Sequence, residues 1–158
     1  MSIFEYSRSP WTARMLSVLR MVTGLMFLTA GTTKLFGFPP SPAPMHPISL
    51  TSQLGLAGML ETVGGTCILL GLFTRAVAFV LAGEMATAYF QAHLPNSFFP
   101  TVNGGVPAVL YCFIYLYMTF AGAGPWSIDA VIARSRHRES LPVPREFEHK
   151  PERIRRTA

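Results

Sequence analysis

Residues 13–36 read ARMLSVLRMVTGLMFLTAGTTKLF, and this stretch decides the fold class. A helix of roughly 24 residues is long enough to cross a bilayer hydrocarbon core of about 30 Å. In lipid a helix satisfies its own backbone hydrogen bonds, which favours a helical span over other structures. A secretory signal peptide is the alternative, but the apolar run is long for one and contains Arg20. We therefore predict a membrane-spanning helix over residues 13–36.

Three further apolar segments follow, each of roughly 18–20 residues. They cover residues 54–73, 76–93 and 105–122. The chain has 158 residues, of which 50% are hydrophobic and 13% charged, about half the charged share of a soluble domain. This pattern predicts an all-α integral membrane protein with a four-helix transmembrane bundle in residues 13–126. An N-terminal segment, residues 1–12, precedes the bundle and a C-terminal region, residues 127–158, follows it.

The charges predict which side of the membrane each connection faces. The connections 37–53 and 94–103 contain no Asp, Glu, Lys or Arg, whereas the tight turn 71–75 ends in an arginine. Eight of the 13 Lys and Arg residues fall within residues 134–156. Because cytoplasmic connections carry the positive charge, both termini are predicted to be cytoplasmic in a multi-pass protein of a bacterial-type inner membrane. The net charge of +5 is thus a topology signal, and it does not indicate nucleic-acid binding.

The C-terminal region is predicted to contain one more helix. Ser127 can cap a short helix over residues 128–138, with its bases along the membrane surface. The remainder, with Pro142, Pro144 and Pro151, is predicted to be an extended or disordered basic tail. The tail is either a solvated charge run or a ligand for anionic headgroups.

Ionisable residues within the spans are the first candidate site. Arg20 and Lys34 lie on one face of the first helix, while Glu61 and Glu84 lie on the second and third helices. Helical rise places Arg20, Glu84 and Glu61 at about 12, 14 and 18 Å from the cytoplasmic boundary, and Lys34 at about 33 Å, where it can snorkel outward. We predict a buried cluster of Arg20, Glu61 and Glu84. It is either an ion-pair clamp between three helices, or a proton relay or polar floor beneath a redox ligand.

A second polar group is predicted near the outer face. Its members are Lys34, His46, Tyr89, Gln91, His93, Asn96 and Asn103. Such groups beside an apolar cleft, with Phe98, Phe99 and Tyr111 as aromatic walls, are suited to a quinone head group. Ordinary interfacial polarity is the other interpretation of the same residues. The prediction includes no intrinsic cofactor and no metal, since Cys67 and Cys112 lie singly in apolar stretches without ligand spacing.

Several short motifs occur in order along the chain. They are Gly31-Thr-Thr-Lys34-Leu35, Gly58-Met-Leu-Glu61, Gly71-Leu-Phe-Thr74-Arg75, Met85-Ala-Thr-Ala88-Tyr89, Asn103-Gly104-Gly105 and Gly122-Ala-Gly124-Pro-Trp-Ser127. Together they resemble the DoxX family of small four-helix membrane proteins. The resemblance covers roughly residues 14–132. One position departs from the pattern, because Val106 stands where a Glu commonly follows the paired glycines. A role that needs a carboxylate there is therefore in doubt for this chain.

The resemblance implies an accessory or anchoring subunit of a quinone-linked membrane redox complex. On this interpretation the partners are the lipid bilayer and a membrane redox protein, quinone is a candidate cofactor, and a homo-oligomer stays open. The chain is not expected to be a catalyst by itself, and no catalytic residue is assigned. The alternative is an independent membrane oxidoreductase or small proton-coupled transporter that uses the Arg20, Glu61 and Glu84 cluster.

Overall fold

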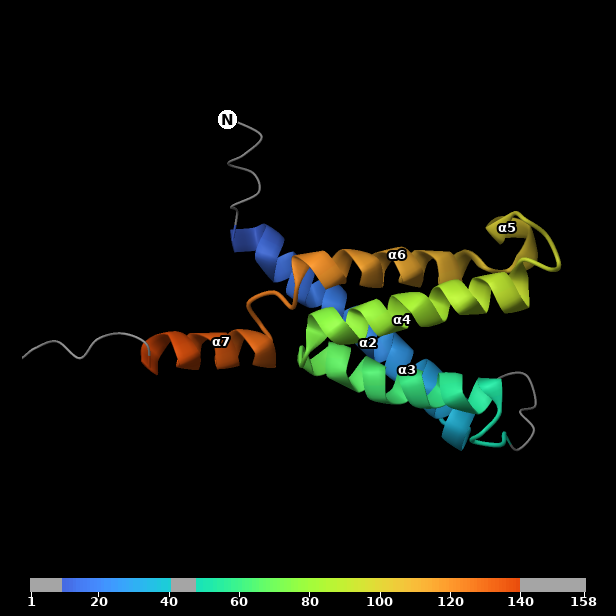
Figure 1. The fold of residues 1–158 in the computed structure, drawn as a ribbon, viewed down its shortest axis with the longest axis horizontal. Coiled ribbons are helices and arrows are strands. Elements are labelled where there is room, and N and C mark those ends of the chain that lie inside the picture. Colours follow the sequence, from blue (N-terminus) through green and yellow to red (C-terminus); the bar gives the residue numbers. More distant parts are fainter. Residues whose placement is uncertain (1–9, 41–47, 140–158) are drawn as a thin grey trace, which may run out of the picture.

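The computed structural model describes residues 10–40 and 48–139 of the chain. The regular elements in these ranges are all helices, named here by the labels of Figure 1. They are α2 (Pro10–Phe36), α3 (Gln53–Leu70), α4 (Thr74–Ala88) with a π-helical continuation η1 (Tyr89–His93), α5 (Pro100–Asn103), α6 (Val106–Ala121) and α7 (Ile128–Glu139). Each of the four predicted apolar segments forms a long helix whose ends lie within a few residues of the predicted ones. Two of them, α2 and α3, are long and apolar enough to cross a membrane, and α6 is a shorter apolar helix.

The four long helices pack as two pairs. Helix α2 packs chiefly against α3, and α4 packs chiefly against α6. The pairs are joined through α3 and α4, which lie close at their connecting turn and diverge away from it (Figure 1). We call the end with this turn, the start of α2 and the start of α7 the α7 end. The opposite end, with residues 37–40, 48–52 and 94–105, is the loop end.

Glycines bring the backbones of α2 and α3 into contact. A Cβ atom added to Gly24 would lie 2.5 Å from the backbone nitrogen of Leu69, and one added to Gly65 would lie 2.5 Å from the backbone nitrogen of Leu28. Both distances are shorter than a side chain tolerates, so these positions require glycine. The two glycines therefore allow α2 and α3 to approach this closely.

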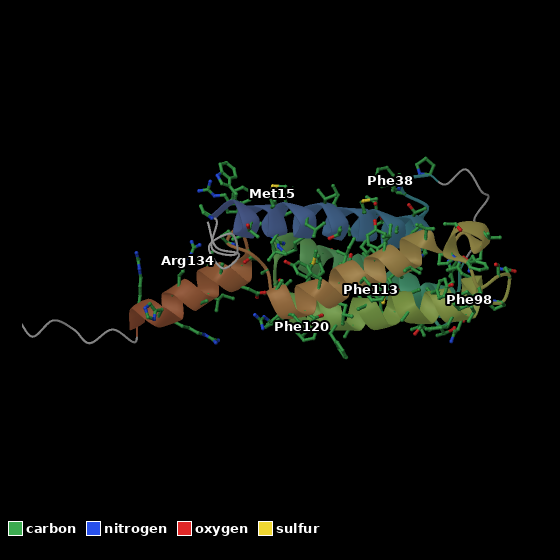
Figure 2. The ribbon with its side chains drawn as sticks, turned by 90° about the horizontal axis from the view of Figure 1, so that it is seen from above. Met15, Phe38, Phe98, Phe113, Phe120 and Arg134 are labelled. Carbon is green, nitrogen blue, oxygen red and sulfur yellow. The ribbon has the colours of Figure 1, made fainter. Side chains whose placement is uncertain are left out.

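The buried core is small and lies between the pairs. It consists of Phe27, Ile68, Ala78, Leu81, Ala82, Met85, Tyr115 and Met118. Phe27 and Tyr115 form an edge-to-face contact with ring centroids 4.8 Å apart. Many other large apolar side chains point outward, including Phe113 and Phe120, which are 65% and 75% exposed (Figure 2). An apolar surface on this scale is typical of helices that face lipid.

Helix α7 is fixed to the α7 end by polar contacts at its first turn. Ser127 accepts a hydrogen bond from the backbone nitrogen of Ala130 at 3.1 Å, which confirms Ser127 as the predicted cap. The Asp129 carboxylate accepts hydrogen bonds from the backbone nitrogens of Phe73 and Thr74, both at 2.9 Å, and so caps α4. Helix α7 extends beyond the ends of α4 and α6, roughly along their direction (Figure 1). The placement of its bases along the membrane surface stays a prediction.

Candidate functional site

A cleft of about 1250 Å³ lies between the two helix pairs. Its lining is mostly apolar and comes from α2, α3, α4, η1 and α6. Several lining side chains in the middle of helices are also exposed, namely Met26, Leu56, Leu60 and Val80. The cleft is therefore accessible along the sides of the helices, where lipid chains would lie in a membrane.

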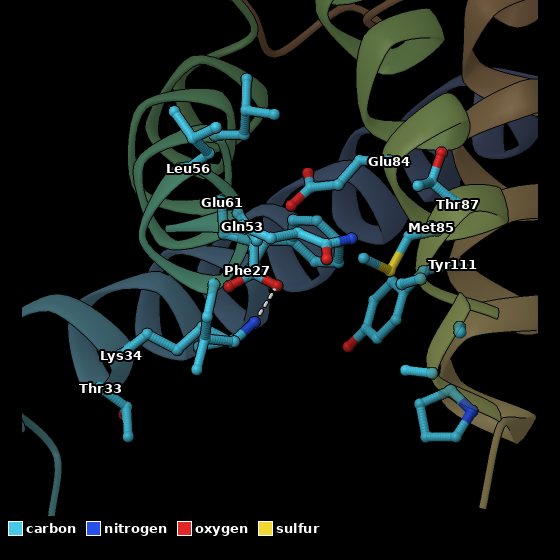
Figure 3. Close-up of a pocket in the computed structure, with 18 of the residues that line it drawn as sticks. Phe27, Thr33, Lys34, Gln53, Leu56, Glu61, Glu84, Met85, Thr87 and Tyr111 are labelled. Atoms are coloured by element: carbon cyan, nitrogen blue, oxygen red, sulfur yellow. Dashed lines mark hydrogen bonds and ion pairs between the residues drawn. The ribbon is translucent and has the colours of Figure 1, made fainter. Parts of the chain in front are cut away.

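One ion pair lies inside this cleft among the described residues. The Lys34 ammonium group of α2 donates a hydrogen bond to Oε1 of Glu61 of α3 (Figure 3). Glu61 is 4% exposed, and Lys34 is partly buried. The prediction that Lys34 snorkels to the outer surface is wrong, because its side chain turns back into the protein to meet a buried carboxylate.

Glu84 of α4 faces the same cleft from the opposite pair (Figure 3). Both of its carboxyl oxygens are buried and have no hydrogen-bond partner within the described residues, and the same holds for Oε2 of Glu61. Buried polar atoms in folded proteins are nearly always hydrogen-bonded, so unpaired ones are informative. Three unpaired carboxyl oxygens in one cleft mark a place where a ligand, a water or a proton is needed.

Aromatic and thioether side chains lie beside the charged group. Phe27 and Tyr111 contact edge to face at a centroid distance of 4.9 Å, and Met85 projects into the cleft next to them (Figure 3). The Tyr111 hydroxyl donates to the sulfur of Met26 at 3.3 Å. Tyr111 is therefore a wall of the cleft, as predicted. Phe98 and Phe99 are 73% and 64% exposed and do not line it, so that part of the prediction is wrong.

Arg20 does not join the two glutamates. Its guanidinium group is 1% exposed and donates to four backbone oxygens at the α7 end. The acceptors are the carbonyl oxygens of Ile68, Leu69 at 2.6 Å, Ala123 at 2.9 Å and Trp126 at 2.6 Å. We call this group the Arg20 junction, because it ties α2 to the end of α3 and to the segment after α6. The prediction that Arg20 is the cation beside Glu61 and Glu84 is therefore wrong. The cation that faces these two carboxyl groups is Lys34.

The predicted outer polar group is divided by the structure. Three of its seven members hold the segment between η1 and α6 together. Tyr89 donates to the carbonyl oxygen of Phe98 at 2.6 Å, Asn96 to that of Ala92 at 3.2 Å, and Asn103 to that of Ser97 at 2.7 Å. His46 lies outside the described residues. For Tyr89, Asn96 and Asn103 the interpretation as structural polarity is therefore the better one.

Gln91 and His93 are the members that reach the cleft together with Lys34. Gln91 accepts a hydrogen bond from the side-chain amide of Gln53, which joins η1 to the start of α3. His93 pairs its Nδ1 with the carbonyl oxygen of Asn103 at 3.1 Å. Gln53 was not among the predicted site residues. The sequence did contain a signal for Gln53, because helical spacing places it on the same face of α3 as Leu56 and Leu60, which also line the cleft.

The end of α4 widens into the π-helix η1, which the sequence analysis did not predict. A π-helical turn holds one more residue than an α-helical turn and often occurs at functional sites. Here it covers Tyr89–His93 and contributes Gln91, Ala92 and His93 to the cleft. Pro107, Ala108 and Tyr111 of α6, the helix that packs against α4, also line the cleft. Val106 adds no carboxylate there, so the acidic groups of the described cleft are Glu61 and Glu84.

The described residues contain no group of three or more His, Cys, Asp or Glu side chains placed to hold a metal ion. Cys67 and Cys112 are both half-buried free thiols. The polar groups of the cleft are therefore one ammonium group, two carboxyl groups, two carboxamides, the His93 imidazole and several hydroxyl groups, in mostly apolar surroundings.

The helical fold and the extensive apolar surface are those of a helical membrane protein. The DoxX family model matches residues 15–94, which include most of α2 and all of α3, α4 and η1. A protein of Haemophilus influenzae described as uncharacterized is 44% identical over 117 residues, covering 72% of this chain and 87% of that protein. No solved structure matches the chain. The chain belongs to the DoxX family, as its motifs predicted, and is a membrane protein of the DoxX type.

Proposed function

We propose that α2, α3, α4 and α6 each cross a bacterial inner membrane, with the α7 end in the cytoplasm. The distribution of charge supports this. Arg14, Arg75 and the α7 arginines belong to the α7 end, whereas residues 37–40, 48–52 and 94–105 at the loop end carry no Asp, Glu, Lys or Arg. Cytoplasmic connections carry the excess of Lys and Arg in membrane proteins.

The topology is tested with single cysteines in a Cys67→Ala, Cys112→Ala background. We expect Ser97→Cys at the loop end to react with a membrane-impermeant maleimide in intact spheroplasts. Ser135→Cys on α7 should react only after the membrane is permeabilised. The opposite pattern would reverse the orientation, and reaction of both in intact spheroplasts would show that α6 does not cross the membrane.

We further propose that the protein is an accessory subunit of a quinone-linked membrane redox complex and that the cleft holds a quinone head group. The observation that carries this proposal is the set of unpaired carboxyl oxygens of Glu84 and Glu61 inside an apolar cleft. A polar head needs a few hydrogen-bond partners in such a site, and an apolar tail needs an exit into lipid. The exposed apolar rim of the cleft offers that exit.

The side chains of the cleft fit such a ligand. Lys34, held by Glu61, is placed to donate to a ring oxygen, and Phe27 and Tyr111 provide flat apolar walls. A bound quinone would supply two-electron, two-proton chemistry, for which the chain's own side chains have no substitute. The chain's contribution is to bind the ring, to exclude water and to present carboxyl groups for proton exchange. Electrons come from a partner protein, which makes the role accessory.

The experiment is a pull-down from native membranes in a mild detergent, with mass spectrometry of proteins and extracted lipids. We expect a stoichiometric redox protein and a quinone to co-purify. Replacing Glu84 with Leu should remove the quinone, and Phe120→Ala on the outer surface serves as the matched control that should retain it. Recovery of the chain alone with ordinary lipids would contradict the proposal.

A second candidate function is a small proton-coupled transporter or independent oxidoreductase. The observation that favours it is the position of Glu84 and Glu61 on opposite walls of one accessible cleft, with Lys34 as the facing cation. Intramembrane carboxyl groups are recurrent parts of proton relays. Purified protein in liposomes with an internal pH dye would then move protons when a pH gradient is imposed. Glu84→Gln should abolish that flux, and a silent wild-type protein would eliminate this candidate.

A further inference from the structure

The cleft has exposed lining side chains on two sides of the bundle. Leu56, Leu60 and Val80 are 51%, 42% and 51% exposed and lie where α3 faces α4. Met26 is 54% exposed and lies where α2 faces α6. A ligand with an apolar chain therefore has two sides by which that chain could reach the lipid, and the contacts at each side distinguish them.

The gap between α3 and α4 is bounded at both of its ends. At the α7 end the two helices meet at the turn after Leu70, and they diverge from there (Figure 1). At the loop end the side-chain amide of Gln53 donates to Gln91 and joins the two helices again. We call the gap between this turn and this hydrogen bond the α3–α4 window.

The side chains of the α3–α4 window are apolar at the surface and acidic behind it. Helical spacing places Leu56 and Leu60 on one face of α3, and Val80 and Glu84 on one face of α4. Leu60 and Glu84 are each about 15 Å along their helix from the turn. The carboxyl oxygens of Glu84 are buried, and Figure 3 shows this side chain extending from α4 toward α3. A molecule in the window thus has leucine and valine around its outer part and a carboxyl group at its inner end.

The side between α2 and α6 is crossed by contacts that a chain would have to break. The Tyr111 hydroxyl donates to the sulfur of Met26 at 3.3 Å, and the Tyr111 ring contacts Phe27 edge to face. Thr29 and Thr33 of α2 add hydroxyl groups to the lining there. An alkyl chain forms no hydrogen bonds, so it gains nothing in exchange for the one between Tyr111 and Met26.

We propose that the apolar chain of the bound quinone leaves the cleft through the α3–α4 window, and that Leu60 determines how well the chain fits. This inference rests on the proposed quinone site and concerns the chain of the ligand, whereas that proposal concerns its head group. Leu60 is the assigned residue because it is at the level of Glu84, where the chain joins the ring. Dispersion contacts with the leucine and valine side chains hold the chain in the window.

The first test locates the chain on the wild-type protein. The purified full-length protein in nanodiscs is irradiated with a decylubiquinone analogue that carries a diazirine on its chain, and the labelled peptides are identified by mass spectrometry. Labelling that excess decylubiquinone removes is specific. We expect specific labels on α3 and α4 around Leu60 and Val80. Specific labels on α2 and α6 would overturn the window, and so would an absence of specific labels while decylubiquinone still binds.

The second test narrows the window with Leu60→Trp. Val63→Trp is the matched control, because Val63 is on the same helix and 65% exposed but does not line the cleft. Calorimetric titration compares decylubiquinone with dimethoxy-methyl-benzoquinone, which is the same ring without the chain, and empty nanodiscs correct for partitioning. A larger side chain in filled space should weaken decylubiquinone binding at least about tenfold in Leu60→Trp. The control should bind both quinones as the wild-type protein does.

The outcomes separate this inference from the proposed quinone site. Unchanged decylubiquinone binding in Leu60→Trp, or an equal loss for the chain-free ring, would overturn the assignment of Leu60 to the chain and leave the quinone site in place. Binding of neither quinone by the wild-type protein overturns the quinone site as well. If Leu60→Trp does not fold, the labelling of the wild-type protein decides the route of the chain by itself.

Discussion

Replacing Arg20 with Met is expected to destabilise the protein strongly, because the Arg20 junction is buried and has no substitute donors. Four carbonyl oxygens from two separate segments accept from this one guanidinium group. An unsatisfied buried acceptor costs about 1–3 kcal/mol, and water reaching the α7 end would satisfy some of the four. Burial of the apolar Met side chain offsets part of the loss. We expect a net decrease of about 3–5 kcal/mol in the free energy of unfolding.

The assay is equilibrium unfolding in mixed micelles of a mild detergent and SDS, followed by circular dichroism. Tryptophan fluorescence is a second probe, because the Trp126 carbonyl oxygen is itself part of the junction. Arg14→Met is the matched control, since Arg14 lies on the same helix but is exposed and stacks on Trp11. Arg20→Lys should be intermediate, because a lysine keeps the charge without the planar fork of donors. If the free energy of unfolding of Arg20→Met lies within about 1 kcal/mol of that of the Arg14→Met control, the Arg20 junction does not stabilise the fold as argued.

Three further predictions use the same unfolding assay. Gly65→Ala should cost about 1–3 kcal/mol because its Cβ would lie 2.5 Å from a backbone nitrogen of α2, whereas Gly83→Ala, which has open space, should be neutral or slightly stabilising. Equal effects of the two would contradict the backbone contact. Asp129→Ala should lower the free energy of unfolding by about 1–2 kcal/mol, because the first amides of α4 lose their acceptor. Hydrogen exchange of these amides should become faster, and an unchanged exchange rate would show that Asp129 does not cap α4. Lys34→Met should lower the free energy of unfolding by about 3 kcal/mol, because it leaves the buried Glu61 carboxylate unpaired. Adding Glu61→Gln should restore most of this stability. Additive losses in the double variant would show that the two residues are not coupled.

The helices could be predicted from the sequence because the length of each apolar segment determines them locally. The close contact of α2 and α3 at Gly24 and Gly65 was visible only in the structure, because it depends on which helices pack together. The π-helix at Tyr89–His93 could not be predicted in the same way. An extra residue in one turn is imposed by packing and has no propensity signal of its own.

The cation of the site was assigned wrongly for a definable physical reason. Counting residues gives the height of each Cα atom, but side chains on a helix lean toward its N-terminus. Helix α2 begins at the α7 end, so Arg20 leans away from the cleft and Lys34 leans into it. Helix α3 runs in the opposite direction, so Glu61 leans toward Lys34. Including this lean would have identified the Lys34–Glu61 pair from the sequence.

The division of the bundle into two pairs has a mechanical consequence. The two pairs are held together at the α7 end by the turn between α3 and α4 and by the Arg20 junction, where four hydrogen bonds meet. On the cleft side, the Gln53 amide donates to Gln91 and the Tyr111 hydroxyl donates to the sulfur of Met26, and both hydrogen bonds link one pair to the other. Loss of the Gln53 hydrogen bond is therefore expected to let the two pairs separate further at the loop end, and so to admit a bulkier head group into the cleft.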